Sequence, residues 1–134
     1  MQRIYKDGFG QTILHLEYFE VENYLYAAFI GMQSLPVLME ASEVMFRILR
    51  EKNCSKYLSD NTQMRGGKDF ADNFIRDTFI PRAIESGLKC VAYVMPSQLL
   101  NIVSIENLEL LFPPDLQFML FDNVAEARYW LLCR

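Results

Sequence analysis

Hydrophobic and polar residues alternate between residues 11 and 19, with Leu14 and Leu16 on one side and His15 on the other. This period of two is typical of a strand with one buried face. Residues 24–30 are apolar on both sides and rich in aromatic side chains, as expected for a strand inside a sheet. A short polar stretch separates the two segments, so we predict an antiparallel hairpin.

Beyond this hairpin the apolar positions recur every three to four residues, which is the period of a helix with one buried face. Residues 34–52 fit this pattern, with Ser34 as N-cap and Pro36 in the first turn, where its missing N–H costs little. Residues 68–86 predict a second long helix. Pro81 lies inside it, so we expect a kink or a restart just before this proline.

The rest of the chain supplies further strands and helices in alternation. Residues 89–95 are almost continuously apolar, which indicates an interior parallel strand covered on both faces. Asn123 and Glu126 have the spacing of a capping box and predict the start of a last helix. The other predicted elements are strands over 54–59 and 116–121 and a helical region over 97–112.

The element order is therefore β-β-α-β-α-β-α-β-α within one domain of 134 residues. Strands separated by helices imply right-handed crossovers and a parallel sheet. We predict an α/β fold with a five-stranded, mostly parallel sheet and about four helices. The first strand should run antiparallel at or near an edge.

Composition narrows the class of protein. Charged residues make up 22% of the chain and hydrophobic residues 51%, the balance of a globular domain rather than a disordered one. The net charge is −4 and the 13 Lys and Arg are scattered, which argues against nucleic-acid binding. No apolar run is long enough to span a bilayer and no signal peptide is evident, so we expect a cytoplasmic protein without an integral membrane segment.

Three cysteines, Cys54, Cys90 and Cys133, are far apart and form no C-x-x-C pair. An odd, dispersed set predicts neither a disulfide framework nor a zinc site. The single histidine, His15, has no nucleophile or second base implied by spacing. We therefore expect no catalytic residues, no metal and no cofactor, and interpret the protein as a non-enzyme.

The best candidate site is a polar cluster after the third predicted strand, where open α/β sheets place ligands. Its members, together with a serine that follows the next strand, are Asp60, Asn61, Thr62, Arg65 and Ser97. A partner or ligand could use the carboxylate, amide, hydroxyls and guanidinium. The alternative is that Asp60 and Thr62 only satisfy backbone amides of a turn.

Two segments carry a resemblance to a known family. They are residues 79–94, Phe-Ile-Pro-Arg-Ala-Ile-Glu-Ser-Gly-Leu-Lys-Cys-Val-Ala-Tyr-Val, and residues 120–131, Leu-Phe-Asp-Asn-Val-Ala-Glu-Ala-Arg-Tyr-Trp-Leu. With the element order, they resemble small bacterial proteins of the STAS (SpoIIAA-like, CRAL-TRIO-like) superfamily, many of them from Bacteroidetes-type bacteria. In true anti-sigma-factor antagonists the turn after the third strand carries a phosphorylatable serine. Here Asp60 matches the aspartate of that motif, no serine pair follows, and Thr62 is an imperfect substitute.

The resemblance implies an interaction or regulatory module that binds a protein partner, or itself as a homodimer, through the turn after the third strand. The alternative is a carrier or sensor of a small apolar or acidic ligand, with a cleft bounded by Asp60, Arg65 and Ser97. The many aromatic and Met residues are interpreted mainly as core. A surface patch for self-association is the other interpretation, with these members: Phe70, Phe74, Phe79 and the segment from Met32 to Met39.

Overall fold

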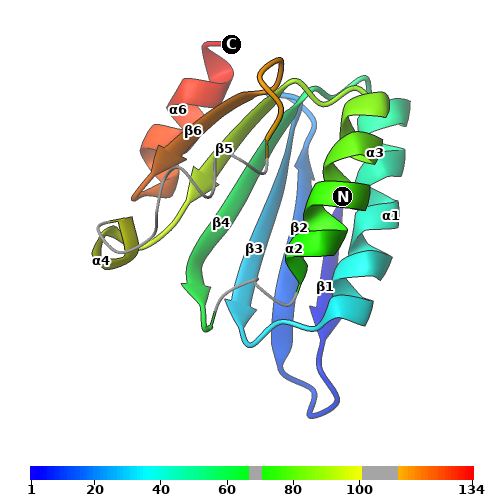
Figure 1. The fold of residues 1–134 in the computed structure, drawn as a ribbon, viewed down its shortest axis with the longest axis vertical. Helices are drawn as coiled ribbons and strands as arrows, with labels where there is room; N and C mark the ends of the chain where they lie inside the picture. Colours follow the sequence, from blue (N-terminus) through cyan, green and yellow to red (C-terminus); the bar gives the residue numbers. More distant parts are fainter. Residues whose placement is uncertain (67–70, 101–111) are drawn as a thin grey trace.

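The computed structural model describes residues 1–66, 71–100 and 112–134. Within these ranges the chain forms one six-stranded mixed sheet whose strand order follows the sequence, β1-β2-β3-β4-β5-β6 (Figure 1). Strand β2 runs antiparallel to both of its neighbours, and β3 to β6 pair in parallel. The strands are β1 (Gln2–Lys6), β2 (Thr12–Phe19), β3 (Tyr24–Gly31), β4 (Lys56–Met64), β5 (Cys90–Val94) and β6 (Gln117–Phe121).

Helices lie on both faces of this sheet. One face is covered by α1 and by a continuous helical segment made of α2, η2 and α3, and the other face by α6 (Figure 1). The bounds are α1 (Leu35–Glu51), α2 (Asp72–Phe74), η2 (Ile75–Phe79), α3 (Ile80–Glu85), α4 (Ser97–Leu100) and α6 (Val124–Leu132). Among the described residues, no helix combines the length and apolar character that crossing a membrane would require.

Each covered face has its own hydrophobic cluster. On the α1 face, alternate residues of β2 and β3 such as Leu16 and Leu25 pack with Phe46 of α1. On the α6 face, Leu58 of β4 packs with Leu131 of α6, and the helix contacts β5 most, with β4 and β6 beside it. Helix α6 covers only the β4–β6 half of this side of the sheet. On the same side, the sheet surface over β1, β2 and most of β3 carries no described helix (Figure 1). We call this the open sheet face.

The α/β class is confirmed, and the sheet is mixed, with antiparallel pairing at its start and parallel pairing from β3 onward; the predicted strand and helix counts are wrong. The structure adds a strand, β1, whose residues are nearly all exposed. Tyr5 is the one residue of this strand that packs against the core, so the strand has no alternation of apolar and polar residues by which the sequence could reveal it. The strand predicted over 54–59 in fact extends to Met64 as β4. The first predicted strand, now β2, does run antiparallel and next to the edge.

The helical predictions are confirmed in part. The second long helix restarts at Ile80 after a π-helical turn, with Pro81 in the first turn of α3, as the missing proline N–H requires. At α6, Asn123 Oδ1 accepts a hydrogen bond from the Glu126 N–H at 2.9 Å, which confirms the predicted cap. Most of the helix predicted over 97–112 lies outside the described residues, and α4 covers its first turn.

The alternative surface patch is not assembled as the sequence suggested. Phe74 and Phe79 pack against the buried cluster of the α1 face, and Phe70 lies outside the described residues. Met32 and Met39 are exposed. Phe74 and Phe79 therefore belong to the core, in line with the main interpretation.

Candidate functional site

The five predicted site residues do not form one cluster. Asp60, Asn61 and Thr62 lie inside strand β4, not in a turn after it. Arg65 follows the strand with an exposed side chain, and its backbone N–H donates to Gly31 O at 2.9 Å. Ser97 is exposed at the start of α4. The structure thus brings Asp60 and Thr62 together and separates Asn61 from them.

Asp60 is fully engaged within the fold. Its side chain is buried, with 7% of the residue exposed. Oδ2 accepts a hydrogen bond from the Tyr26 hydroxyl at 2.7 Å, and Oδ1 accepts from Thr62 Oγ1 at 2.7 Å and from the Thr62 N–H at 3.1 Å. A carboxylate held in this way stabilises the strand and cannot be approached freely by a partner.

A β-bulge explains why these residues stay in the strand. Ala28 pairs with Asp60 and Ile30 with Gln63. Between these two pairs β4 therefore contains one residue more than β3. The extra residue disrupts the ladder locally. Asp60 Oδ1 accepts a hydrogen bond from the Thr62 N–H. This bond satisfies an amide that the interrupted strand pairing would otherwise leave unpaired.

This geometry counts against a phosphorylation switch at Thr62. Its hydroxyl oxygen lies 2.7 Å from Asp60 Oδ1, and a phosphoryl group would bring about 1.5 to 2 negative charges to that position. Like charges at such a distance repel each other. Thr62 also lies in a strand, away from the helix start at which a phosphate would gain backbone N–H partners.

Asp60 is the end of a longer row of side-chain contacts that begins on the open sheet face and reaches β4. Tyr26, which donates to Asp60, has its ring in an edge-to-face contact with His15, with centroids 6.3 Å apart. His15 Nε2 lies 3.4 Å from Glu17 Oε1 but has no hydrogen-bond partner among the described residues, and Glu17 Oε1 accepts a hydrogen bond from Gln2 Nε2 at 3.2 Å. We call these residues the open-face row: Gln2, Glu17, His15, Tyr26, Asp60 and Thr62.

The strand register sets the open-face row. Glu17 pairs with Gln2 on one side and with Tyr26 on the other, and directly paired residues point to the same face of a sheet. Burial is the main reason that the pKa of Tyr26 is raised, and the hydrogen bond to Asp60 adds to the rise. Tyr26 is therefore a protonated donor at neutral pH. The hydroxyl and the carboxylate it binds act as a fixed pair.

The chemistry of the open-face row suits recognition. Tyr26, Thr62 and Asp60 bind one another, so none of them is poised to attack a substrate. His15 and Glu17 are half-buried on an exposed sheet surface, beside Ile4, which is 50% exposed. Acid–base catalysis gains most in a site that excludes water. A mixed polar and apolar face of this kind is compatible with a protein-binding surface, whose composition is close to that of the protein surface in general.

Asn61 points to the opposite face and ties two strands together. Its Nδ2 donates to Ser59 O at 3.1 Å and to Val94 O of β5 at 3.2 Å. The residue is 2% exposed, and its Oδ1 has no hydrogen-bond partner within the part of the chain that the structure describes. Asn61 therefore contributes to the sheet and lies away from the open-face row.

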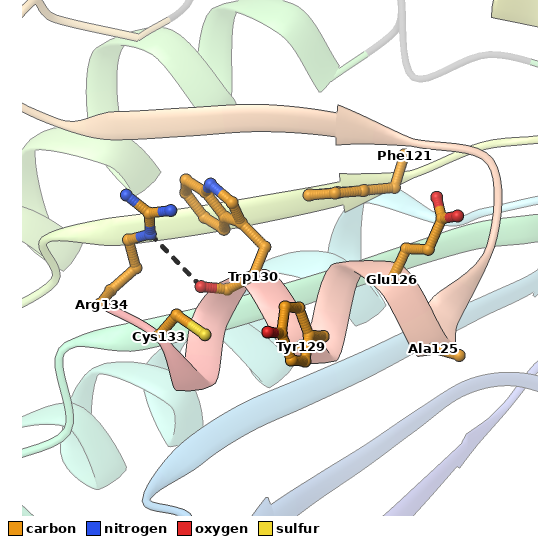
Figure 2. Close-up of a pocket in the computed structure, with 7 residues that line it drawn as sticks. All are labelled: Phe121, Ala125, Glu126, Tyr129, Trp130, Cys133 and Arg134. Carbon is orange, nitrogen blue, oxygen red and sulfur yellow. Dashed lines mark hydrogen bonds between the residues drawn. The ribbon is translucent and has the colours of Figure 1, made fainter.

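Among the grooves that described residues line, two are of moderate volume. One, of about 560 Å³, lies between α6 and β6, and Figure 2 shows Phe121, Tyr129, Trp130 and Cys133 around it. The other, of about 390 Å³, has these lining residues: Ile84, Gly87, Leu88, Lys89, Asp115, Leu116 and Gln117. Neither includes Asp60, Arg65 or Ser97, so neither corresponds to the ligand cleft expected from the sequence.

Sequence reasoning placed only Asp60 and Thr62 of the open-face row in the candidate site, and the other four members, Gln2, His15, Glu17 and Tyr26, were not predicted as site residues. A signal for one of them was present, because a hairpin turning over residues 20–23 places Glu17 opposite Tyr26. Gln2 could not be found in this way, since β1 has no apolar alternation. Comparison with family models, with curated proteins and with solved structures gives no significant match to this chain, so the functional conclusion depends on the site itself.

Proposed function

We propose that this protein is a non-enzymatic interaction module, of the STAS-like kind that its sequence resembles, and that it binds a protein partner through the open sheet face. The observation that carries the proposal is the open-face row, a set of polar side chains across four adjacent strands, of which β1, β2 and most of β3 carry no described helix on this side and β4 is in contact with α6. The proposed partner surface is therefore the open sheet face next to Asp60, and not the turn that the sequence predicted.

Preorganisation supports this role. Side chains that are already fixed by neighbours lose little conformational entropy when a partner docks, which favours binding. Tyr26 and Asp60 hold each other at 2.7 Å, and Gln2 fixes Glu17. The exposed Ile4 adds apolar surface directly opposite His15. A partner that offers hydrogen-bond donors to Glu17 and an apolar side chain to Ile4 would match this face.

The test uses two exposed apolar residues with nearly equal exposure. Ile4 on the open face is 50% exposed, and Met39 on α1 is 48% exposed. Proteins from a host lysate are captured on the wild type, on Ile4→Glu and on Met39→Glu, and quantified by mass spectrometry. We expect a set of proteins that the wild type and Met39→Glu retain and that Ile4→Glu loses at least tenfold. Equal capture by both variants would reject the open face as the partner surface.

A second candidate function is supported by Asn61. Its buried Oδ1 lacks a partner among the described residues, and a buried acceptor left unpaired costs free energy. A small ligand with a hydroxyl or protonated carboxyl group could donate to it. Native mass spectrometry of protein purified from its host would then show a bound mass that Asn61→Asp reduces, whereas the apoprotein mass alone would exclude this function.

A further inference from the structure

The two edges of the sheet differ in how they are protected. Edge strands expose unpaired backbone groups, and charged side chains are a common device against pairing with another chain. Strand β1 at one edge carries Arg3 and Lys6. Strand β6 at the other edge has the sequence Gln-Phe-Met-Leu-Phe, with no charge and no proline. The β6 edge is therefore the one suited to pairing.

The backbone groups of β6 that have no partner strand among the described residues can be identified from the bonds of β6 to β5. Gln117 N–H donates to Lys89 O, and Phe121 O accepts from Met95 N–H, so these residues face β5. Because successive residues of a strand alternate, the N–H and C=O groups of Phe118 and Leu120 point away from β5. Within the described residues β6 pairs with β5 alone.

An apolar groove lies beside this edge. Figure 2 shows the Phe121 and Trp130 rings along the groove, with Tyr129 on the outer side of α6. Tyr129 is 73% exposed and Met119 of β6 is 45% exposed. Large apolar side chains gathered around an unpaired edge are typical of an interface between proteins.

We propose that a second copy of this chain pairs with β6 in antiparallel fashion, about a two-fold axis at Met119. Phe118 then lies opposite Leu120 of the second copy, and Leu120 opposite its Phe118. Since both residues direct their N–H and C=O groups outward, each of these two pairs exchanges two hydrogen bonds. The twelve-stranded sheet that results has no free β6 edge.

The position of α6 fits this arrangement. The helix packs mainly over β5, and adjacent strands are about 4.8 Å apart, so the two α6 axes would lie three spacings, or about 14 Å, from each other. Helices in direct contact are about 8–10 Å apart. The remaining space is what Tyr129, Trp130 and Phe121 of both copies would fill.

Charge also supports a second copy as the occupant. Glu126 lies near the start of α6 and Arg134 just beyond its end, and both line the groove. The Arg134 guanidinium is held over the Trp130 ring at 4.7 Å from its centroid. A two-fold axis makes the two α6 helices antiparallel, so that Glu126 of each copy faces Arg134 of the other. The open sheet face is not covered, and the inference is therefore independent of the proposed function.

Sedimentation velocity of the whole chain tests this proposal. We expect a dimer for the wild type, and a dissociation constant at least tenfold higher for Leu120→Pro. Proline at this position removes only an outward-facing N–H, so the ladder with β5 is retained. A wild type that stays monomeric at about 100 μM would overturn the proposal, because a specific homodimer is expected to form below that concentration.

A cross-linking measurement keeps the proposal testable if Leu120→Pro does not fold. Met119→Cys places two cysteines opposite each other at a pair with Cα atoms about 4.5 Å apart, within the range of a disulfide. Met39→Cys, at a site of similar exposure on α1, is the control. In a Cys133→Ser background with oxidised glutathione, Met119→Cys should cross-link at least tenfold faster. Equal rates for the two variants would contradict pairing at β6.

Discussion

Replacement of Asp60 by alanine tests whether this residue is part of the fold or a free recognition group. The structure gives its carboxylate three hydrogen bonds, one from Tyr26 and two from Thr62. Asp60→Ala removes the acceptor of all three donor groups, the Tyr26 hydroxyl and the Thr62 hydroxyl and N–H, which lie on a half-buried surface. If Asp60 stood in an exposed turn, as its sequence context suggested, the same change would have almost no effect on stability.

The expected magnitude follows from these bonds. A hydrogen bond to a charged group contributes about 1.5–3 kcal/mol, and a donor left unsatisfied adds to the loss. Water can reach Tyr26 and Thr62 in part, and the variant no longer has to bury a carboxylate, so each bond should count for about 1 kcal/mol. We therefore expect Asp60→Ala to lower the free energy of unfolding by about 3 kcal/mol. Asp60→Asn, which keeps an acceptor, should cost about 1 kcal/mol.

The assay is urea unfolding followed by the fluorescence of Trp130, the only tryptophan, at one fixed protein concentration. Asp7→Ala is the matched control, because Asp7 Oδ1 also accepts two hydrogen bonds, from the N–H groups of Phe9 and Gln11, but in an exposed turn. It should cost at most about 1 kcal/mol. A loss below about 0.5 kcal/mol for Asp60→Ala would refute the role given to the Tyr26–Asp60–Thr62 contacts.

Two further predictions concern stability. Burial raises the pKa of Tyr57. Above about pH 10 the tyrosine of the unfolded chain has lost its proton, whereas Tyr57 of the folded state still holds it. The free energy of unfolding should therefore fall above about pH 10, by up to about 1.4 kcal/mol per pH unit for this group. Alkaline urea titrations should show a smaller slope for Tyr57→Phe, and an unchanged slope would contradict the buried hydroxyl. Asn123→Ala removes the cap of α6 and should cost about 1 kcal/mol, whereas Asn123→Ser should restore most of it in thermal melts.

Much of the fold could be predicted because the apolar pattern of each of the following elements shows whether one side or both sides of it are buried. The alternation in β2, the helical period of α1 and the continuous apolar run of β5 are each visible in the sequence, and Pro81 locates the restart of a helix. These signals are local. They depend only on which side of an element is buried, and that choice is made by the side chains themselves.

The site was predicted less well because its side chains satisfy one another across strands. A polar stretch such as Asp60 to Thr62 is typical of a turn when read alone. It remains in β4 because Tyr26 from the neighbouring strand donates to Asp60, and because Asn61 binds Val94 of β5 from the other face. Such partners are known only once the strand register is known. The same holds for Glu17 and Gln2, which meet through the pairing of β1 with β2.

The most direct test of the central claim uses the only histidine and the only tryptophan of the chain as two reporters in solution NMR. His15 lies in the open-face row, and Trp130 lies in the groove beside β6. When a captured partner is added, the account predicts that the imidazole signals of His15 shift while the indole signal of Trp130 keeps its position. A complex that forms with His15 unchanged, or that shifts Trp130 alone, would contradict partner binding through the open sheet face.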